Sequence, residues 1–182
     1  MKMVIIFLLM LTSFPWAGNK STAEDPSPVV NCLVKFSVNN AGVEVTGTLG
    51  VATAQINFHS DEPNLNTISA TADPATIQTG ITIRDTHLMR SDYFDVEKYN
   101  AINLTSKSLR KVGKNKFKGV FNLTIKGITK SIVIPFNLTY EEKVIIYRGE
   151  FEINRLDFKL GEESLILDEK VKISFEAKTT TP

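Results

Sequence analysis

The segment from Ile81 to Asn100 holds the residues of this chain with the clearest potential for chemistry. Arg84 and Asp85 are adjacent, and His87, one of only two histidines, follows closely. His87 could accept a proton in catalysis if an orienting carboxylate such as Asp85 and a nucleophile lay beside it. The chain contains no G-x-S-x-G motif or comparable nucleophile elbow. A small hydrolase or isomerase built on His87 and Asp85 is therefore the weakest functional hypothesis, and no enzymatic activity is expected.

Arg84 and Asp85 also fit a purely structural role. Asp85 is predicted to cap a short helix and to pair with Arg84. Arg155 and Asp157 lie two residues apart on one face of a predicted strand, where they would form a buried ion pair. The structural interpretation is slightly favoured over a binding role for these residues and for His87.

Composition excludes several classes of partner. The chain has 21 Lys and Arg against 20 Asp and Glu, so no broad basic face for nucleic acid is expected. Two separated histidines and one cysteine give no metal constellation, and neither a metal nor another cofactor is predicted. Cys32 alternates in phase with Val34 and Phe36, which predicts a buried core thiol, and a reactive or lipidated cysteine is the alternative.

The N-terminal part divides into two short regions ahead of one domain. Residues 1–18 resemble a secretory signal peptide, with Lys2 at the start and an apolar run from Met3 to Leu11. That run is shorter than the roughly 20 residues that a membrane-spanning helix needs. We therefore expect export, to a periplasm or the extracellular space. Residues 19–29 are rich in small, polar and proline residues and are predicted to form a disordered leader.

Apolar and polar residues alternate through most of residues 30–180, which form the predicted domain. Alternation with a period of two predicts strands that each bury one face. The eight expected strands lie near residues 30–38, 43–49, 52–58, 68–72, 117–125, 132–138, 145–153 and 171–177. An antiparallel sandwich and a closed up-and-down barrel both fit, and the barrel is favoured because closure removes exposed strand edges.

The opening segment interrupts this pattern. Ile81 and Ile83 still alternate, so a strand is expected to reach them before a short helix over residues 86–90. A helical insertion around residues 85–95 would close one end of the barrel and place the charged residues at its rim. Its apolar plug would consist of Leu88, Phe94 and Tyr99.

Three blocks of sequence, in order, resemble the YceI-like polyisoprenoid-binding family. They are TIQTGITIRDTHLMRSDYFDVEKYNAI, FKGVFNLTIKGITKSIVIPF and FEINRLDF. The second block is similar to the family pattern G-x-L-x-I-K-G-x-T-K, and the third is similar to I-N-R-x-D-F. Two positions depart from the family. Asn100 stands where proline is usual, and the glycine expected after Phe158 is displaced to Gly161, near the mouth of the barrel.

The resemblance implies a lipocalin-like, eight-stranded antiparallel barrel that binds a prenyl chain in its apolar interior. The implied ligand is an isoprenoid lipid, either an isoprenoid quinone or a polyprenyl phosphate. An arginine could grip a phosphate or quinone oxygen with its fork of donors. The candidates for the head group or rim are Arg84, Asp85, His87 and Arg155. The candidates for the cavity wall are Phe36, Ile56, Phe58, Ile83, Leu88, Phe94, Phe121, Leu123, Ile134, Phe136, Phe151 and Phe175.

Two hypotheses of different class follow. The first is an exported lipid-binding protein for transport, storage or stress protection, and it requires an open, continuous apolar cavity. The second is a barrel with a filled interior that serves as an interaction or stress-response module without a lipid ligand. The sequence leaves open a transient contact with a membrane and a homodimer.

Overall fold

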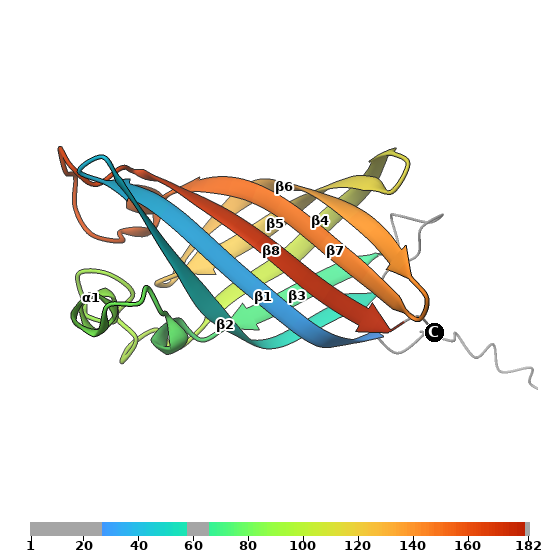
Figure 1. Cartoon of the computed structure of the whole chain (residues 1–182), viewed down its shortest axis with the longest axis horizontal. Helices are drawn as coiled ribbons and strands as arrows, with labels where there is room; N and C mark the ends of the chain where they lie inside the picture. The colour runs from blue at the N-terminus through green and yellow to red at the C-terminus, as the bar shows by residue number, and fades with distance from the viewer. Residues whose placement is uncertain (1–26, 58–65, 181–182) are drawn as a thin grey trace, which may run out of the picture.

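The alternating segments form eight strands that close into one antiparallel barrel. The computed structural model describes residues 27–57 and 66–180 (Figure 1). Each strand pairs with its neighbours along the chain, and β8 pairs with β1 to close the ring. This confirms the predicted barrel with a short helical insertion. The strands are β1 (Ser27–Asn40), β2 (Val43–Asn57), β3 (Thr67–Ala72), β4 (Ile102–Gly113), β5 (Lys116–Ile125), β6 (Ile128–Glu141), β7 (Val144–Asn154) and β8 (Lys170–Thr180).

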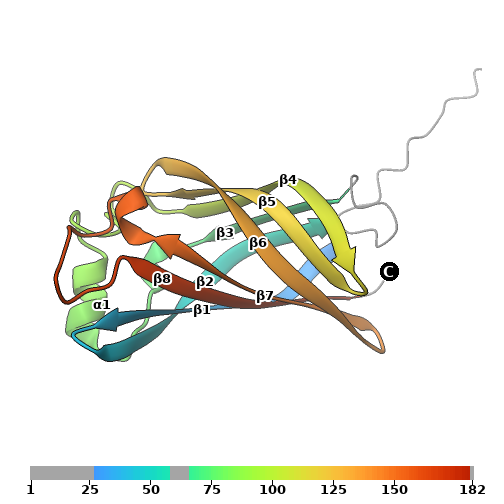
Figure 2. The same ribbon diagram turned by 90° about the horizontal axis from the view of Figure 1, so that it is seen from above.

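One end of the barrel carries the helical segments of the described chain. The 3-10 helix η2 (Pro74–Thr76) and the helix α1 (Thr82–Leu88) connect β3 to β4, and η3 (Arg155–Phe158) follows β7. Figures 1 and 2 show these connections at the same end as the turn between β1 and β2. We call this end the mouth. Its connections are residues 41–42, 73–101, 126–127 and 155–169.

The second strand is continuous, where two strands were predicted. β2 is 15 residues long, and its pairing with β3 shifts register between Val51 and Thr53. Leu49 faces the barrel interior before this bulge, and Ile56 faces it afterwards. Because a bulge moves the buried face from odd to even positions, the sequence looks like two separate alternating runs.

β4 was not predicted at all. Its pairing with β5 shifts register between Ser106 and Ser108. Ile102 and Leu104 line the interior before the shift, and after it Leu109 is buried at 2% exposure. The strand therefore has no sustained alternation and few apolar residues. Its partners on both sides hold it in the barrel.

The prediction of a strand through Ile83 and of a helix cap at Asp85 is wrong. Gly80 has φ of +82° and turns the chain away from the sheet. α1 then starts after Ile81, and Asp85 lies inside its first turn. Ile83 points outward and is 84% exposed, so it does not belong to the cavity wall.

The predicted buried pair between Arg155 and Asp157 does not form. β7 ends at Asn154, whose side-chain oxygen accepts a hydrogen bond from the Leu156 N–H and starts η3. Asp157 is exposed and lies 3.3 Å from Nζ of Lys130. The 3-10 turn separates Arg155 and Asp157, which a continuous strand would have kept on one face.

The N-terminal boundary lies slightly earlier than predicted. β1 begins at Ser27, so the last three residues of the predicted leader belong to the barrel. The predicted signal peptide, residues 1–18, falls outside the described residues. Within residues 27–57 and 66–180, no helix is long and apolar enough to cross a membrane.

The interior is tightly packed in its half away from the mouth. Leu109, Phe117, Phe136 and Leu138 are each at most 4% exposed. The rings of Phe117 and Phe136 stack with their centroids 5.6 Å apart. This packing fills the wall formed by β4, β5 and β6 and leaves the open space of the barrel nearer the mouth.

Candidate binding cavity

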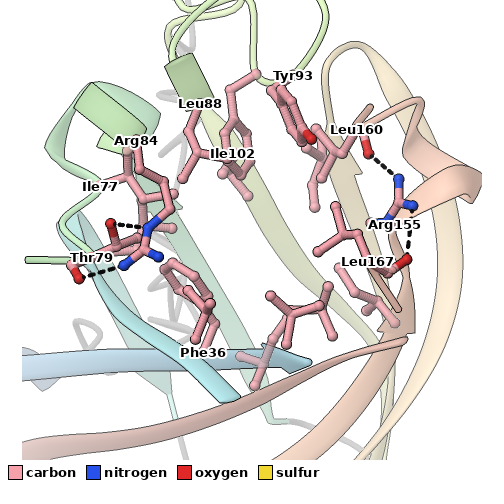
Figure 3. Close-up of a pocket in the computed structure, with 18 of the residues that line it drawn as sticks. Phe36, Ile77, Thr79, Arg84, Leu88, Tyr93, Ile102, Arg155, Leu160 and Leu167 are labelled. Atoms are coloured by element: carbon pink, nitrogen blue, oxygen red, sulfur yellow. Dashed lines mark hydrogen bonds between the residues drawn. The ribbon is translucent and has the colours of Figure 1, made fainter. Parts of the chain in front are cut away.

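An apolar chamber of about 310 Å³ lies inside the mouth, and we call it the upper chamber. Its size is at the lower end of the range of roughly 300 to 1,000 Å³ that is usual for ligand pockets. Figure 3 shows its wall, with Arg84 and Arg155 on opposite sides. The apolar part of the wall includes Phe36, Val45, Ile77, Leu88, Phe94 and Leu167.

A second space of about 140 Å³, the lower chamber, continues toward the middle of the barrel. Four residues line both chambers and form a neck between them: Val34, Leu49, Ile102 and Ile173. The lower chamber is almost entirely apolar. The single cysteine, Cys32, faces it, and burial raises the pKa of this thiol to about 11. The two chambers are therefore adjacent apolar spaces inside the barrel, separated by the four residues of the neck.

Most of the predicted wall residues face this path. Phe36, Leu88 and Phe94 line the upper chamber. The residues in the lower chamber are Ile56, Phe121, Leu123, Ile134, Phe136, Phe151 and Phe175. Phe58 lies outside the described residues. Of the predicted plug, Leu88 and Phe94 reach the upper chamber, whereas the ring of Tyr99 lies over Gly127 in the β5–β6 turn.

Arg84 and Asp85 both bind Thr79. Nε of Arg84 donates to the Thr79 hydroxyl at 2.7 Å, and Nη2 donates to its carbonyl at 2.9 Å. The Thr79 N–H and hydroxyl both donate to Oδ1 of Asp85. Arg84 and Asp85 are therefore linked through Thr79, and the direct ion pair that was predicted between them does not form. Arg84 and Thr79 line the upper chamber, and Asp85 supports them from outside it.

Arg155 lines the same chamber from the opposite side and is only 3% exposed. Its guanidinium donates to three backbone carbonyls: Nη1 to Leu160 at 2.9 Å, Nε to Asp168 at 3.0 Å and Nη2 to Leu167 at 3.2 Å. Each of its three nitrogens therefore has a partner. Arg155 fixes the connection between η3 and β8 against the barrel.

His87 is held by a carboxylate that was not predicted. Its Nε2 lies 2.7 Å from Oδ2 of Asp92, and its ring meets Tyr93 edge-on with centroids 5.1 Å apart. The hydrogen bond from His87 lowers the pKa of Asp92. His87 lines the upper chamber, and within residues 27–57 and 66–180 no serine or cysteine lines that chamber beside it. The arrangement orients a side chain at the mouth and does not form a catalytic triad.

Exposed apolar side chains surround the mouth. Leu165 and Ile166 are 106% and 60% exposed, beside Leu167, which faces the chamber. Ile81 and Ile83 contribute from the start of α1, at 53% and 84% exposure. The Ala41 N–H donates to the Ile166 carbonyl at 2.6 Å, which ties this connection to the β1–β2 turn. The connections that line the chamber thus also carry exposed apolar side chains.

Several wall residues were missed in the sequence. Val34, Val38, Leu49 and Ile173 share the alternation of Phe36 or of their own strand, so the pattern itself identifies them. The connections give no such signal. Ile77, Thr79, Leu160 and Leu167 enter the wall only because the mouth connections fold back over the barrel.

Comparison with known sequences identifies the family. The YceI-like domain matches residues 25–179. UPF0312 protein plu2095 of Photorhabdus laumondii is 29% identical over 117 residues, a match that covers 64% of this chain but 60% of that protein. A UPF0312 protein of Pseudomonas savastanoi is 28% identical over 156 residues, covering 80% of each chain.

Solved structures show the same barrel. BcnA of Burkholderia cenocepacia superposes with a TM-score of 0.78 at 22% identity, covering 82% of this chain and 96% of BcnA. The YceI protein of Campylobacter jejuni gives 0.70 at 25% identity, covering 76% and 85%. A polyisoprenoid binding domain from Saccharophagus degradans gives 0.66 at 13% identity, covering 87% and 100%. The sequence match over most of the chain, together with this shared fold, shows that the chain belongs to the YceI-like domain family.

Proposed function

We propose that this protein is a carrier that holds an isoprenoid lipid in its two-chamber cavity and catalyses no reaction. The observation that carries the proposal is the pair of adjacent apolar chambers, one inside the mouth and one toward the middle of the barrel, which share four wall residues. The solved Saccharophagus domain with the same fold is described as polyisoprenoid binding, which supports this ligand class. An isoprenoid quinone and a polyprenyl phosphate both have a tail of the required kind.

The cavity explains affinity better than selectivity. Moving a hydrocarbon tail from water into an apolar channel contributes about 25 cal/mol per Å² of buried apolar surface. An apolar wall separates ligands that differ by one methylene by only roughly 1–3 kcal/mol. The polar residues of the upper chamber are therefore the groups able to distinguish one head group from another.

The alternative, a filled barrel without a lipid ligand, is less well supported. It requires the inward phenylalanines to meet across the barrel. Phe117 and Phe136 do stack, but Phe36, Phe121 and Phe175 border open space in the two chambers. The packed wall is thus confined to one part of the interior, and the cavity favours the carrier.

Loading from a membrane and export of the protein belong to the same proposal. A prenyl tail is stored in lipid bilayers because its transfer to water is unfavourable. The exposed apolar residues at the mouth, including Ile83, Leu165 and Ile166, lie on the connections that also supply residues of the chamber wall. Contact of this rim with a bilayer surface would let the tail enter without crossing water. The signal-like sequence of residues 1–18 supports export.

The deciding experiment is native mass spectrometry of the protein purified from bacteria without detergent, followed by solvent extraction of any bound molecule. The carrier proposal predicts a stoichiometric adduct that the extract identifies as a prenyl lipid. The matched control is a Leu49→Trp variant, whose narrowed neck should reduce the amount of long-chain prenyl lipid that is bound. A bare protein mass that stays unchanged after incubation with quinones and polyprenyl phosphates would favour the filled barrel.

A further inference from the structure

We propose that the upper chamber selects lipids whose polar end is an oxyanion, a phosphate or a carboxylate, and that Arg84 binds this group. The inference rests on the carrier function proposed above and specifies the class of its ligand. It follows from the charges of the chamber wall and from the hydrogen bonds that each basic side chain already makes.

The wall of the upper chamber carries two arginines and one histidine. Arg84, His87 and Arg155 line it, and no aspartate or glutamate does so among the described residues. Arg155 is 3% exposed and binds three carbonyls, with no carboxylate among its described partners. No carboxylate among these partners neutralises the charge of the guanidinium, which has five donors and no acceptor. That charge favours a negative group in the chamber over a neutral one.

Among the described residues, Arg84 is the arginine of the chamber wall with a terminal nitrogen that makes no hydrogen bond. All three nitrogens of Arg155 have carbonyl partners, and His87 is engaged by Asp92 through Nε2. Arg84 uses Nε and Nη2 to bind Thr79. In the part of the chain that the structure describes, its Nη1 has no hydrogen-bond partner. Two N–H groups of Nη1 are thus available at the chamber wall.

The position of Arg84 is fixed before a ligand arrives. The hydroxyl of Thr79 donates to Asp85, so its lone pairs face the Nε–H of Arg84. Asp85 also accepts the Thr79 N–H at 2.8 Å. Figure 3 shows the guanidinium held by Thr79 at the edge of the chamber. A side chain that is already ordered loses little entropy on binding, and a guanidinium fork matches phosphate and carboxylate oxygens.

The test compares two ligands with the same tail, geranylgeranyl phosphate and geranylgeraniol, on the intact protein. Hydrogen bonds to a charged group are stronger than those to a neutral group, so we expect the phosphate to bind about 10- to 100-fold more tightly than the alcohol. Arg84→Gln should abolish this ratio by weakening the binding of the phosphate, and its binding of geranylgeraniol is measured to check that the cavity is intact. Arg84→Lys should keep part of the ratio, because it retains the charge and loses the fork. Arg90 is an exposed arginine at the same mouth and does not line the chamber. Arg90→Gln should therefore leave the affinity ratio of the two ligands unchanged.

The outcomes separate the two proposals. Equal affinity for the phosphate and the alcohol would overturn the oxyanion site and leave the carrier intact. A preference that survives in Arg84→Gln would overturn the assignment of Arg84. Binding of neither ligand, in the wild type as well as in the variants, would overturn the carrier proposal itself.

Discussion

Gly47 lies directly beneath the ring of Phe36. The two residues are opposite each other in the β1–β2 ladder, and a Cβ atom on Gly47 would overlap the phenyl ring and lie 2.7 Å from the Gln78 carbonyl oxygen. Phe36 can therefore lie flat against the wall of the upper chamber only because its neighbour has no side chain.

Replacement of this glycine should damage both stability and binding. In Gly47→Ala, the ring of Phe36 must move into the chamber, and we expect a loss of about 1–3 kcal/mol from overpacking together with weaker lipid binding. Urea denaturation and a lipid-displacement assay measure the two effects. Gly113→Ala is the control, because a Cβ there has no atom nearer than 3.6 Å. Equal stability of the two variants would contradict this account of Gly47.

The neck between the chambers should set the length of tail that fits. Leu49 lines both chambers, and Leu49→Trp should close the passage between them. We expect an octaprenyl lipid to lose roughly 10- to 200-fold in affinity, whereas a farnesyl lipid that needs only the upper chamber is retained. Competition binding of the two lipids measures this difference. Thr46 is exposed on β2, so the control variant Thr46→Trp should change the affinity for neither lipid. If Leu49→Trp weakened the binding of both lipids equally, the chambers would not act in series.

Arg155 should be a major determinant of stability. Arg155→Met would leave the carbonyls of Leu160, Leu167 and Asp168 without their donors, and hydrogen bonds to a charged group contribute about 1.5–3 kcal/mol each. We expect a loss of at least about 3 kcal/mol in urea denaturation. Arg148→Met, which removes an exposed pair with Glu176, should cost less than about 1 kcal/mol. Similar losses in the two variants would show that the three carbonyl bonds are weak.

The bond between His87 and Asp92 should depend on pH. It lowers the pKa of Asp92, so the folded state is favoured when this carboxylate is ionised. Its stabilising effect is present above the ordinary aspartate pKa of about 3.9 and is lost as the pH falls through the lowered value. In a His87→Ala variant, the pKa of Asp92 should rise, as followed by NMR of the carboxyl carbon. An Asp92 pKa that does not respond to the loss of the imidazole would refute this coupling.

The apolar rim should bind neutral lipid vesicles. A double variant, Ile83→Asn with Leu165→Asn, should float less protein with phosphatidylcholine vesicles and should load lipid from them more slowly, because two exposed apolar contacts are removed. Val133→Asn is the matched control, since Val133 is 57% exposed on the side of the barrel, away from the mouth. Loading at the wild-type rate in the double variant would show that the rim is not the route of entry.

The barrel could be predicted from the sequence because alternation is a property of single strands. The alternation is interrupted at the bulges of β2 and β4, where one extra residue shifts the buried positions of the strand from odd to even or the reverse. The order of the strands and the inward phenylalanines survive such local errors. The phase of a weakly apolar strand such as β4 is set by its partners, which no short stretch of sequence reveals.

The site was predictable only in part. Of the four candidates that the family resemblance gave for the head group or rim, Arg84, His87 and Arg155 line the upper chamber, and Asp85 does not. Their partners were not predictable, because Thr79, Asp92 and the carbonyls around Arg155 come from irregular connections. A hydrogen bond to a backbone carbonyl leaves no trace in the side-chain pattern, so a buried arginine such as Arg155 looks like half of an ion pair.

The three carbonyl bonds of Arg155 fix the connection between η3 and β8 at the mouth, a role that a disulfide could also fill. With one cysteine in the chain, no internal disulfide can cross-link residues 155–169. An arginine that joins the carbonyls of Leu160, Leu167 and Asp168 closes the same loop without sulfur. This cross-link cannot be reduced, and it forms as soon as the chain folds. The mouth should therefore keep its shape equally well with and without dithiothreitol, in reducing and oxidising compartments alike.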